Sequence, residues 1–195
     1  LTTDRIADME SRSETAPYQQ VEDSLDFQLV RARLRAQEDS PQDAVLAARK
    51  VLDEKRYNSE TAARYGLVTA LIRARQFKDA EAEAQKLPSG KTGSPMIQLL
   101  IARTALAAGN QMLALQRYQT GSQAYPGYRP LQYGYISALL AAGRSSDAQT
   151  QVDRQLALYP LDRRLWRLAA QTHAQQGRRL LSHRAQAEAA ALSGN

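Results

Sequence analysis

One fixed spacing recurs through the second half of this chain of 195 residues. Three kinds of residue follow it: Gly109, Gly143 and Gly177, then Ala114 and Ala148, then Pro126 and Pro160. The same step back from Ala114 reaches Ala80. Because three kinds of landmark share one period, chance is a poor explanation, and a fixed period of this length is the sequence signature of stacked structural repeats.

Each unit of this period reads as two helices joined by a short turn. Apolar residues recur at helical spacing before each glycine and again after it. Glycine tolerates the left-handed backbone at the end of the first helix, and proline cannot continue the second. Ser145 or Ser146 is expected to cap one second helix, with Asp147 in its first turn. The expected helices of the regular units are 60–75 and 77–87, 95–108 and 111–124, and 130–142 and 146–158.

The first unit departs from the period. Its expected helices are 25–37 and 41–55. The apolar stripe of the first of them consists of Phe27, Val30 and Leu34. The step from Ala44 to Ala80 is longer by two than the step from Ala80 to Ala114, so this unit is offset from the others.

The last expected helix pair is 161–176 and 178–192, and Ser182 stands where the small alanine of the series is expected. The sequence therefore predicts an all-α fold, a helix–turn–helix solenoid of about four to five helix pairs with a short N-terminal helix outside the repeats. The expected repeat domain is 25–195, with units at 25–58, 60–94, 95–128, 129–162 and 163–195. A last helix without a neighbour exposes its inner face. Either this face is a cap or the repeats continue beyond Asn195, and we expect the second.

These units resemble the tetratricopeptide repeat family, a helix–turn–helix repeat of the same period. Alanine falls where the second helix must approach its neighbour, glycine at the turn within the repeat, and proline at its exit. The large aromatic residue early in the first helix is present only as Trp166. The resemblance implies the fold of that family and says little about function.

Stacked helix pairs curve and leave a concave face lined by first helices. With the series alanines as the register, the candidate partner-binding residues of that groove are Tyr65, Thr69, Leu99, Arg103, Tyr133, Ser137, Arg164, Arg167 and Gln171. The face is apolar and aromatic in the middle and basic at one end, and Tyr and Arg are frequent binding hot spots. The alternative is that some of these residues pack against the next repeat or an absent domain. The groove lacks a dense Lys/Arg/Asn clamp, so capture of a C-terminal carboxylate is a minor option.

Composition excludes several kinds of chemistry. The chain has no Cys, which rules out disulfides, Cys-ligated zinc and thiol catalysis. His173 and His183 are its only histidines; His173 is expected to pack in the core, with a ligand role unsupported. There is no His-Glu-x-x-His, no Gly-rich phosphate loop and no Gly-x-Ser-x-Gly. We therefore expect no catalytic residue, no metal site and no cofactor in this chain, and no long apolar run predicts a membrane span.

The net charge of +6 is unevenly distributed. Residues 1–60 carry 9 Lys/Arg and 13 Asp/Glu, a net of −4, and residues 61–195 carry 17 and 7, a net of +10. A basic body indicates an acidic protein, an anionic membrane surface or nucleic acid as partner, or simply a solvated surface with scattered arginines. Nucleic acid is disfavoured because there is no zinc finger or RNP-type motif.

Residues 1–16 do not fit the repeat. Thr2 or Thr3 can cap a short helix whose small apolar stripe is Ile6 and Met9. The run Leu-Thr-Thr-Asp-Arg-Ile-Ala-Asp-Met at 1–9 resembles the segment that closes the catalytic domain of periplasmic zinc metallopeptidases, specifically those that enhance outer-membrane β-barrel assembly. In that family repeats follow, with a Tyr-Gly in an early first helix, as at Tyr65 here.

This second resemblance implies that residues 1–24 are the tail of a protease domain plus a linker. By the same resemblance the zinc-binding His-Glu-x-x-His lies upstream, the location is periplasmic, and no catalytic residue can be carried over to this chain. The implied role is docking of protein partners: the chain's own protease domain, the β-barrel assembly machinery and misassembled barrel proteins. Two alternatives stay open, a stand-alone scaffold or chaperone adaptor with no attached enzyme, and an enzymatic activity within the chain itself.

Overall fold

A computed structural model describes residues 3–15, 22–88 and 93–194 of the chain. These residues form eleven helices and no strand. The helices are α1 Thr3–Thr15, α2 Leu25–Glu38, α3 Pro41–Asp53, α4 Glu60–Arg73, α5 Phe77–Ala84, α6 Pro95–Ala107, α7 Gln111–Ala124, α8 Arg129–Ala141, α9 Ser145–Leu158, α10 Arg163–Gln175 and α11 Arg179–Ala191.

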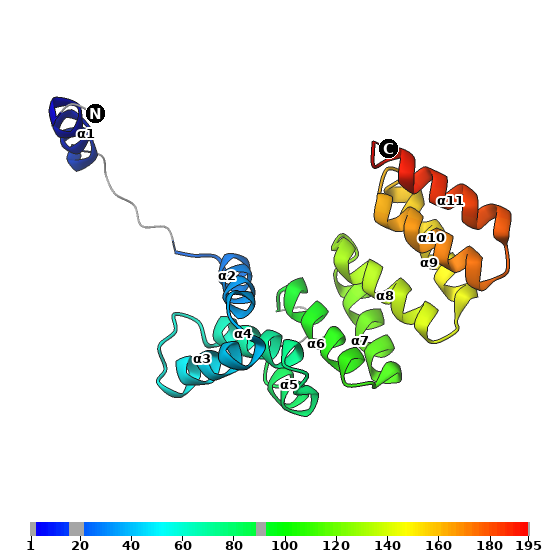
Figure 1. Ribbon diagram of the computed structural model, residues 1–195, viewed down its shortest axis with the longest axis horizontal. Coiled ribbons are helices and arrows are strands. Elements are labelled where there is room, and N and C mark those ends of the chain that lie inside the picture. The colour runs from blue at the N-terminus through cyan, green and yellow to red at the C-terminus, as the bar shows by residue number, and fades with distance from the viewer. Residues whose placement is uncertain (1–2, 16–21, 89–92, 195) are drawn as a thin grey trace.

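The helices from α2 to α11 form five antiparallel pairs that follow one another along a curved row (Figure 1). Each first helix contacts the first helix of the next unit, so α2, α4, α6, α8 and α10 make one continuous face. We call it the first-helix face. The helix α1 stands apart from this row in Figure 1. The predicted all-α solenoid of helix pairs, with a short helix before it, is confirmed.

The recurring glycines and alanines lie at the turns and in the helix contacts that the period predicts. Gly109, Gly143 and Gly177 have left-handed backbones, with φ of 81°, 72° and 72°, at the turn between the two helices of their units. Ala80, Ala114 and Ala148 are completely buried on the second helices. A buried alanine lets two helix axes approach closely, because no longer side chain holds them apart.

Ser182, the exception in the last unit, is also buried. Its hydroxyl donates a hydrogen bond of 2.9 Å to the carbonyl oxygen of Ala170 on α10. The hydroxyl is therefore satisfied inside the helix pair, and a serine replaces the alanine without an unpaired buried polar group.

Two local expectations are corrected. The cap residue of α9 is Arg144, which makes no side-chain cap bond, instead of Ser145 or Ser146. The Arg144 side chain donates to Asp147 at 2.7 Å, so the predicted acidic residue of the first turn is occupied by this bond.

The stripe expected on the first helix of the first unit is the second correction. Phe27, Val30 and Leu34 are 51%, 43% and 57% exposed, and α2 instead buries Leu29 and Ala36 against its neighbours. Apolar residues thus lie on two sides of α2. The side with Leu29 and Ala36 packs against the neighbouring helices, and the predicted stripe is exposed.

Candidate functional site

The nine predicted groove residues lie on four successive first helices. Tyr65 and Thr69 lie on α4, Leu99 and Arg103 on α6, Tyr133 and Ser137 on α8, and Arg164, Arg167 and Gln171 on α10. Tyr65, Thr69 and Arg103 lie around a hollow at the N-terminal end of the face. Tyr133 and Arg164 join α8 to the start of α10. The other four belong to neither group.

The hollow has a volume of about 420 Å³. Its lining comes from three first helices: Arg33 and Gln37 of α2, Tyr65, Thr69, Ile72 and Arg73 of α4, and Leu100 and Arg103 of α6. We call it the arginine pocket. It brings together three predicted residues, Tyr65, Thr69 and Arg103, and three guanidinium groups from three successive units.

The sequence interpretation missed Arg33, Gln37, Arg73 and Leu100. The signal for Arg33 was present, because the step from Arg33 to Thr69 equals the step from Ala44 to Ala80 in the same two units. The step from Thr69 to Arg103 likewise equals that from Ala80 to Ala114. Arg33, Thr69 and Arg103 therefore hold one position of the repeat. Arg73 carried no such signal.

Arg73 is held by the end of α2. Its guanidinium donates to the carbonyl oxygens of Ala36 and Asp39, the second at 3.2 Å. These carbonyls are the partial negative end of the helix, which favours a cation there. Arg73 therefore has a fixed place in the pocket wall.

Arg33 and Arg103 are not balanced by acids. Among the residues that the structure describes, no carboxylate lies within ion-pair distance of either guanidinium. Both side chains are exposed at the pocket mouth. The pocket therefore holds positive charge that a negatively charged group could neutralise.

Tyr65 forms the buried part of the wall. Burial raises the pKa of its hydroxyl, and the charges of Arg33 and Arg103 act in the opposite direction. The hydroxyl therefore stays protonated at neutral pH beside two arginines. The main chain of Tyr65 is also used, because the Thr69 hydroxyl donates to its carbonyl oxygen at 2.9 Å.

The second group centres on Asp162, the cap residue that precedes α10. Its Oδ1 accepts hydrogen bonds from the backbone N–H groups of Arg164 and Leu165 at 2.9 and 3.2 Å. Its Oδ2 accepts from the Tyr133 hydroxyl and from Arg129 Nη1, the latter at 3.1 Å. Although burial alone raises the pKa of Asp162, these bonds, led by that of Tyr133, bring it below its ordinary value.

Tyr133 is buried, and the guanidinium of Arg164 lies 4.7 Å from the centre of its ring. The side chain of Tyr133 thus joins α8 to the start of α10. The predicted residues Ser137, Arg164, Arg167 and Gln171 are exposed, and Leu99 is half-buried. Their role in binding a partner stays a prediction.

No group of three or more His, Asp or Glu side chains is placed to hold a metal ion in residues 3–15, 22–88 and 93–194. His173, which was expected to pack in the core, is only half-buried, and its buried Nδ1 has no hydrogen-bond partner among those residues. None of the described helices is both long and apolar enough to cross a bilayer.

The comparisons with known proteins agree with the fold. The tetratricopeptide repeat family model matches residues 105–172, from the end of α6 into α10. The comparison with curated proteins gives no match. The similarity to that family model is confined to residues 105–172, and the other similarity is to solved structures.

Those structures share the fold at low identity. MamA (AMB-1) is 16% identical over 86% of this chain and 98% of its own, with a TM-score of 0.64. MamA (MSR-1) is 15% identical over 86% and 95%, with a TM-score of 0.63. YrrB, described as a TPR protein with an unusual peptide-binding site, is 14% identical over 97% and 92%, with a TM-score of 0.62. Likeness at this level establishes the helix-pair solenoid.

Proposed function

We propose that this tetratricopeptide-type solenoid is a non-catalytic protein-interaction domain that binds a partner polypeptide along its first-helix face. The arginine pocket receives a carboxylate of the partner, from an acidic side chain or a chain end. The observation that carries the proposal is the convergence of Arg33, Arg73 and Arg103 on one hollow of about 420 Å³.

The chemistry of the pocket fits a carboxylate on a polypeptide. A guanidinium can donate two parallel hydrogen bonds to a carboxylate, and Arg73 is already held in place. Ile72 and Leu100 give the wall an apolar part for the neighbouring side chains of a peptide. The net charge of +10 on residues 61–195 would also speed the approach of an acidic segment. The similar fold of YrrB, a TPR protein with an unusual peptide-binding site, supports the same use of this fold.

A binding experiment with short fluorescent peptides tests the proposal. One peptide alternates acidic and leucine residues, and its counterpart carries Asn and Gln instead of Asp and Glu. We expect the acidic peptide to bind more tightly than its counterpart. Arg103→Ala should lower the affinity for the acidic peptide about tenfold, because it removes one charge-assisted hydrogen bond of about 1.5 kcal/mol. Arg154→Ala is the matched control, since Arg154 is an exposed arginine on the second helix α9. Equal binding of both peptides, or equal loss in both variants, would contradict the proposal.

The resemblance of residues 1–9 supports a narrower proposal. The domain would serve a periplasmic zinc metalloprotease of the β-barrel assembly-enhancing family, docking the assembly machinery or misassembled barrel proteins, with zinc held by the protease domain. The alternative is a stand-alone scaffold or chaperone adaptor. The reading frame upstream of Leu1 separates them: a His-Glu-x-x-His there supports the protease, and its absence supports the scaffold.

A further inference from the structure

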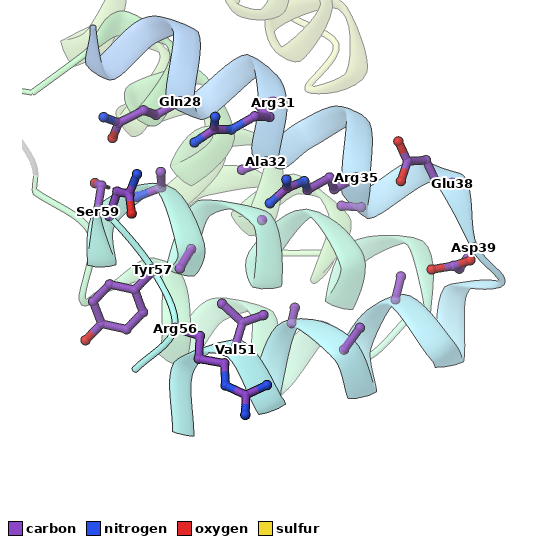
Figure 2. A pocket seen from close by; sticks show the side chains of 18 residues that line it. Gln28, Arg31, Ala32, Arg35, Glu38, Asp39, Val51, Arg56, Tyr57 and Ser59 are labelled. Atoms are coloured by element: carbon purple, nitrogen blue, oxygen red, sulfur yellow. Dashed lines mark hydrogen bonds between the residues drawn. The ribbon is translucent and has the colours of Figure 1, made fainter. Parts of the chain in front are cut away.

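A second hollow lies at the N-terminal end of the solenoid, on residues that do not line the arginine pocket. It has a volume of about 610 Å³ and lies between α2 and α3, with α4 as its floor (Figure 2). We call it the α2–α3 trough.

The trough exists because its floor is made of small residues. Ala32, Ala48, Ala62 and Gly66 contribute to its lining, and none of them extends beyond a Cβ. A Cβ built on Gly66 would lie 3.4 Å from the Cβ of Ala32, so α2 and α4 are in direct contact there. The two helices are close and α3 packs on the other side of α4, which leaves the space between α2 and α3 unfilled.

The rim of the trough carries three arginines and two acidic residues. Arg31, Arg35 and Arg56 are labelled along it in Figure 2, and Glu38 and Asp39 lie at the end where α2 turns into α3. Arg31 and Arg56 each have an exposed acidic neighbour, Asp23 at 3.3 Å and Glu54 at 3.1 Å. Among the described residues, Arg35 forms no ion pair.

The helix α1 has exposed apolar side chains and a net negative charge, which complement the hollow and the arginines of this trough. Its apolar side chains Ile6 and Met9 are 45% and 68% exposed, and they lie three residues apart on one side of the helix. Residues 3–15 carry four acidic and two basic residues, a net charge of −2, opposite to the arginines of the rim. A helix of 13 residues is marginal in water without tertiary contacts, so α1 needs a partner surface to persist.

The connection between them is long enough. Residues 16–24 separate the end of α1 from the start of α2, and nine residues can span up to about 30 Å. Such a short tether also gives α1 an effective concentration in the millimolar range at the trough of its own chain.

We propose that the α2–α3 trough is the docking site of α1 from the same chain. Ile6 and Met9 fill the hollow above the alanine and glycine floor, and the acidic side chains of α1 face the arginines of the rim. The docked helix caps the exposed N-terminal end of the solenoid. The proposal concerns a different surface from the arginine pocket, so either can fail without the other.

Disulfide trapping tests the docked state, and the absence of native cysteines makes the test clean. Met9→Cys is combined with Ala47→Cys, because Ala47 lines the trough and is exposed. The control combines Met9→Cys with Leu46→Cys, an exposed neighbour on α3 that does not line it. Both substitutions on α3 are at exposed positions, and equal thermal melting of the two variants verifies that they fold alike.

We expect the Met9–Ala47 pair to form an intramolecular disulfide at least about tenfold faster than the control pair. The tether raises the local concentration of the cysteine at position 9 equally in both variants, but docking would place it next to position 47 and not next to position 46. A further Ile6→Glu substitution should lower the rate to that of the control. Equal rates for the two pairs, or a rate unaffected by Ile6→Glu, would overturn the proposal. Covalent dimers as the main product would assign the trough to a second copy of the chain and would overturn it as well.

Discussion

Arg75 and Gly109 occupy the same turn in two successive repeats, and both have a left-handed backbone, with φ of 59° and 81°. The hydrogen bonds around them correspond as well. The N–H of Arg75 donates to Ile72 O at 3.1 Å, and that of Gly109 donates to Leu106 O at 3.0 Å. A residue with a Cβ pays about 1–2 kcal/mol for this conformation, which glycine adopts freely.

Arg75→Gly should therefore stabilise the fold. Its gain is reduced by the greater freedom of glycine in the unfolded chain, so we expect roughly 0.5–1 kcal/mol more free energy of unfolding. Denaturant melts followed by circular dichroism measure it. Gly109→Ala is the reverse control and should lose a similar amount, since no atom lies within 4 Å of a Cβ at that position and only the backbone is strained. An unchanged midpoint for Arg75→Gly would contradict this account.

Gly134→Ala should be strongly destabilising for a different reason. A Cβ at Gly134 on α8 would lie 2.2 Å from a ring carbon of the buried Tyr118 on α7, so the ring or the helix must move. Overpacking of this kind costs typically about 1–3 kcal/mol, which exceeds the gain of about 1 kcal/mol from replacing a helical glycine. Gly127→Ala, in open space, should change the free energy of unfolding by less than about 0.5 kcal/mol. Equal stability of the two variants would refute the close contact of α7 and α8.

The fold could be predicted well from the sequence, because the residues that end a helix or let two helices approach lie within each unit and recur at the same spacing. The expected helix 111–124 coincides with α7, and glycine and alanine hold the places that the period assigns. The start of α10 was expected at residue 161 and lies at Arg163, because Asp162 caps it with bonds to two backbone N–H groups. Aspartate is a preferred cap residue, so that boundary was readable in principle.

The site was less accessible to sequence reasoning. The register alone places Tyr65, Thr69 and Arg103 on one face, but the position of Arg73 depends on where α2 ends in space. The register also assigns Tyr133 to a groove position, but its hydroxyl donates a hydrogen bond to Asp162, 29 residues later in the chain. A periodic pattern gives the side of a helix on which a residue lies, and does not give its hydrogen-bond partner.

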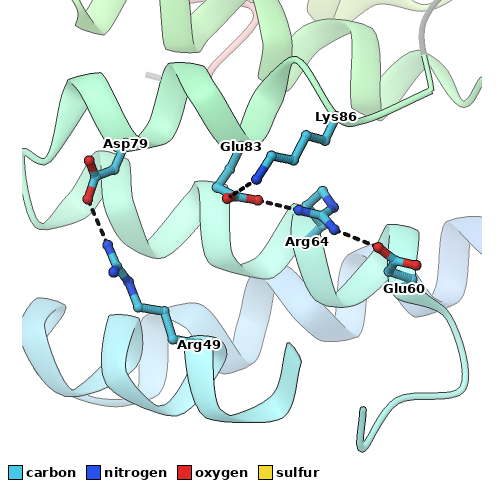
Figure 3. A network of polar contacts seen from close by, with 6 residues as sticks. All are labelled: Arg49, Glu60, Arg64, Asp79, Glu83 and Lys86. Carbon is cyan, nitrogen blue, oxygen red and sulfur yellow. Dashed lines mark hydrogen bonds and ion pairs between the residues drawn. The ribbon is translucent and has the colours of Figure 1, made fainter. Parts of the chain in front are cut away.

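Arg64 links α4 to α5 through a half-buried ion-pair network (Figure 3). Its guanidinium binds Glu60 at 2.5 Å and Glu83, and Glu83 also accepts from Lys86 at 2.6 Å. The side chains of Arg64 and Glu83 are only 17% and 20% exposed. Arg64→Met should cost about 2 kcal/mol, because Glu83 is left in a partly buried place with one partner fewer.

Arg49→Met is the control for this effect. Arg49 binds Asp79 at 2.7 Å between α3 and α5, but both side chains are about half exposed (Figure 3). An exposed ion pair contributes at most about 1 kcal/mol, so this variant should lose less than Arg64→Met. Equal losses in denaturant melts would contradict the importance of burial.

The Glu83 carboxyl also makes the network sensitive to acid. Burial alone raises its pKa, but the bonds from Lys86 and Arg64 are together stronger and lower it below the ordinary 4.5. A carboxyl with a lowered pKa in the folded state stabilises the fold above pH 4.5 and loses that contribution as the pH falls through its folded value. The difference in stability between the wild type and Arg64→Met should therefore shrink as the pH is lowered below 4.5. A difference that is constant with pH would exclude this role of Glu83.

Tyr133 should make the fold sensitive to alkali in the opposite direction. Burial, followed by the hydrogen bond to Asp162 and the negative charge of that carboxylate, raises the pKa of Tyr133 to about 12. A tyrosine whose pKa is higher in the folded state than its ordinary 10 stabilises the fold below pH 10, and this contribution is lost as the pH rises from 10 to about 12.

Tyr133→Phe removes the hydroxyl and should cost about 1–2 kcal/mol at neutral pH, since the lost bond is to a charged group. The variant should then lose less additional stability between pH 10 and about 12 than the wild type. Tyr65 and Tyr118, whose pKa is also raised by burial, titrate in both proteins. Tyrosinate absorbance during the titration checks the cause, because the folded variant should lack a transition near pH 12 that the wild type shows. If the two proteins lose equal stability over this range, the bond between Tyr133 and Asp162 does not join α8 to α10 in solution.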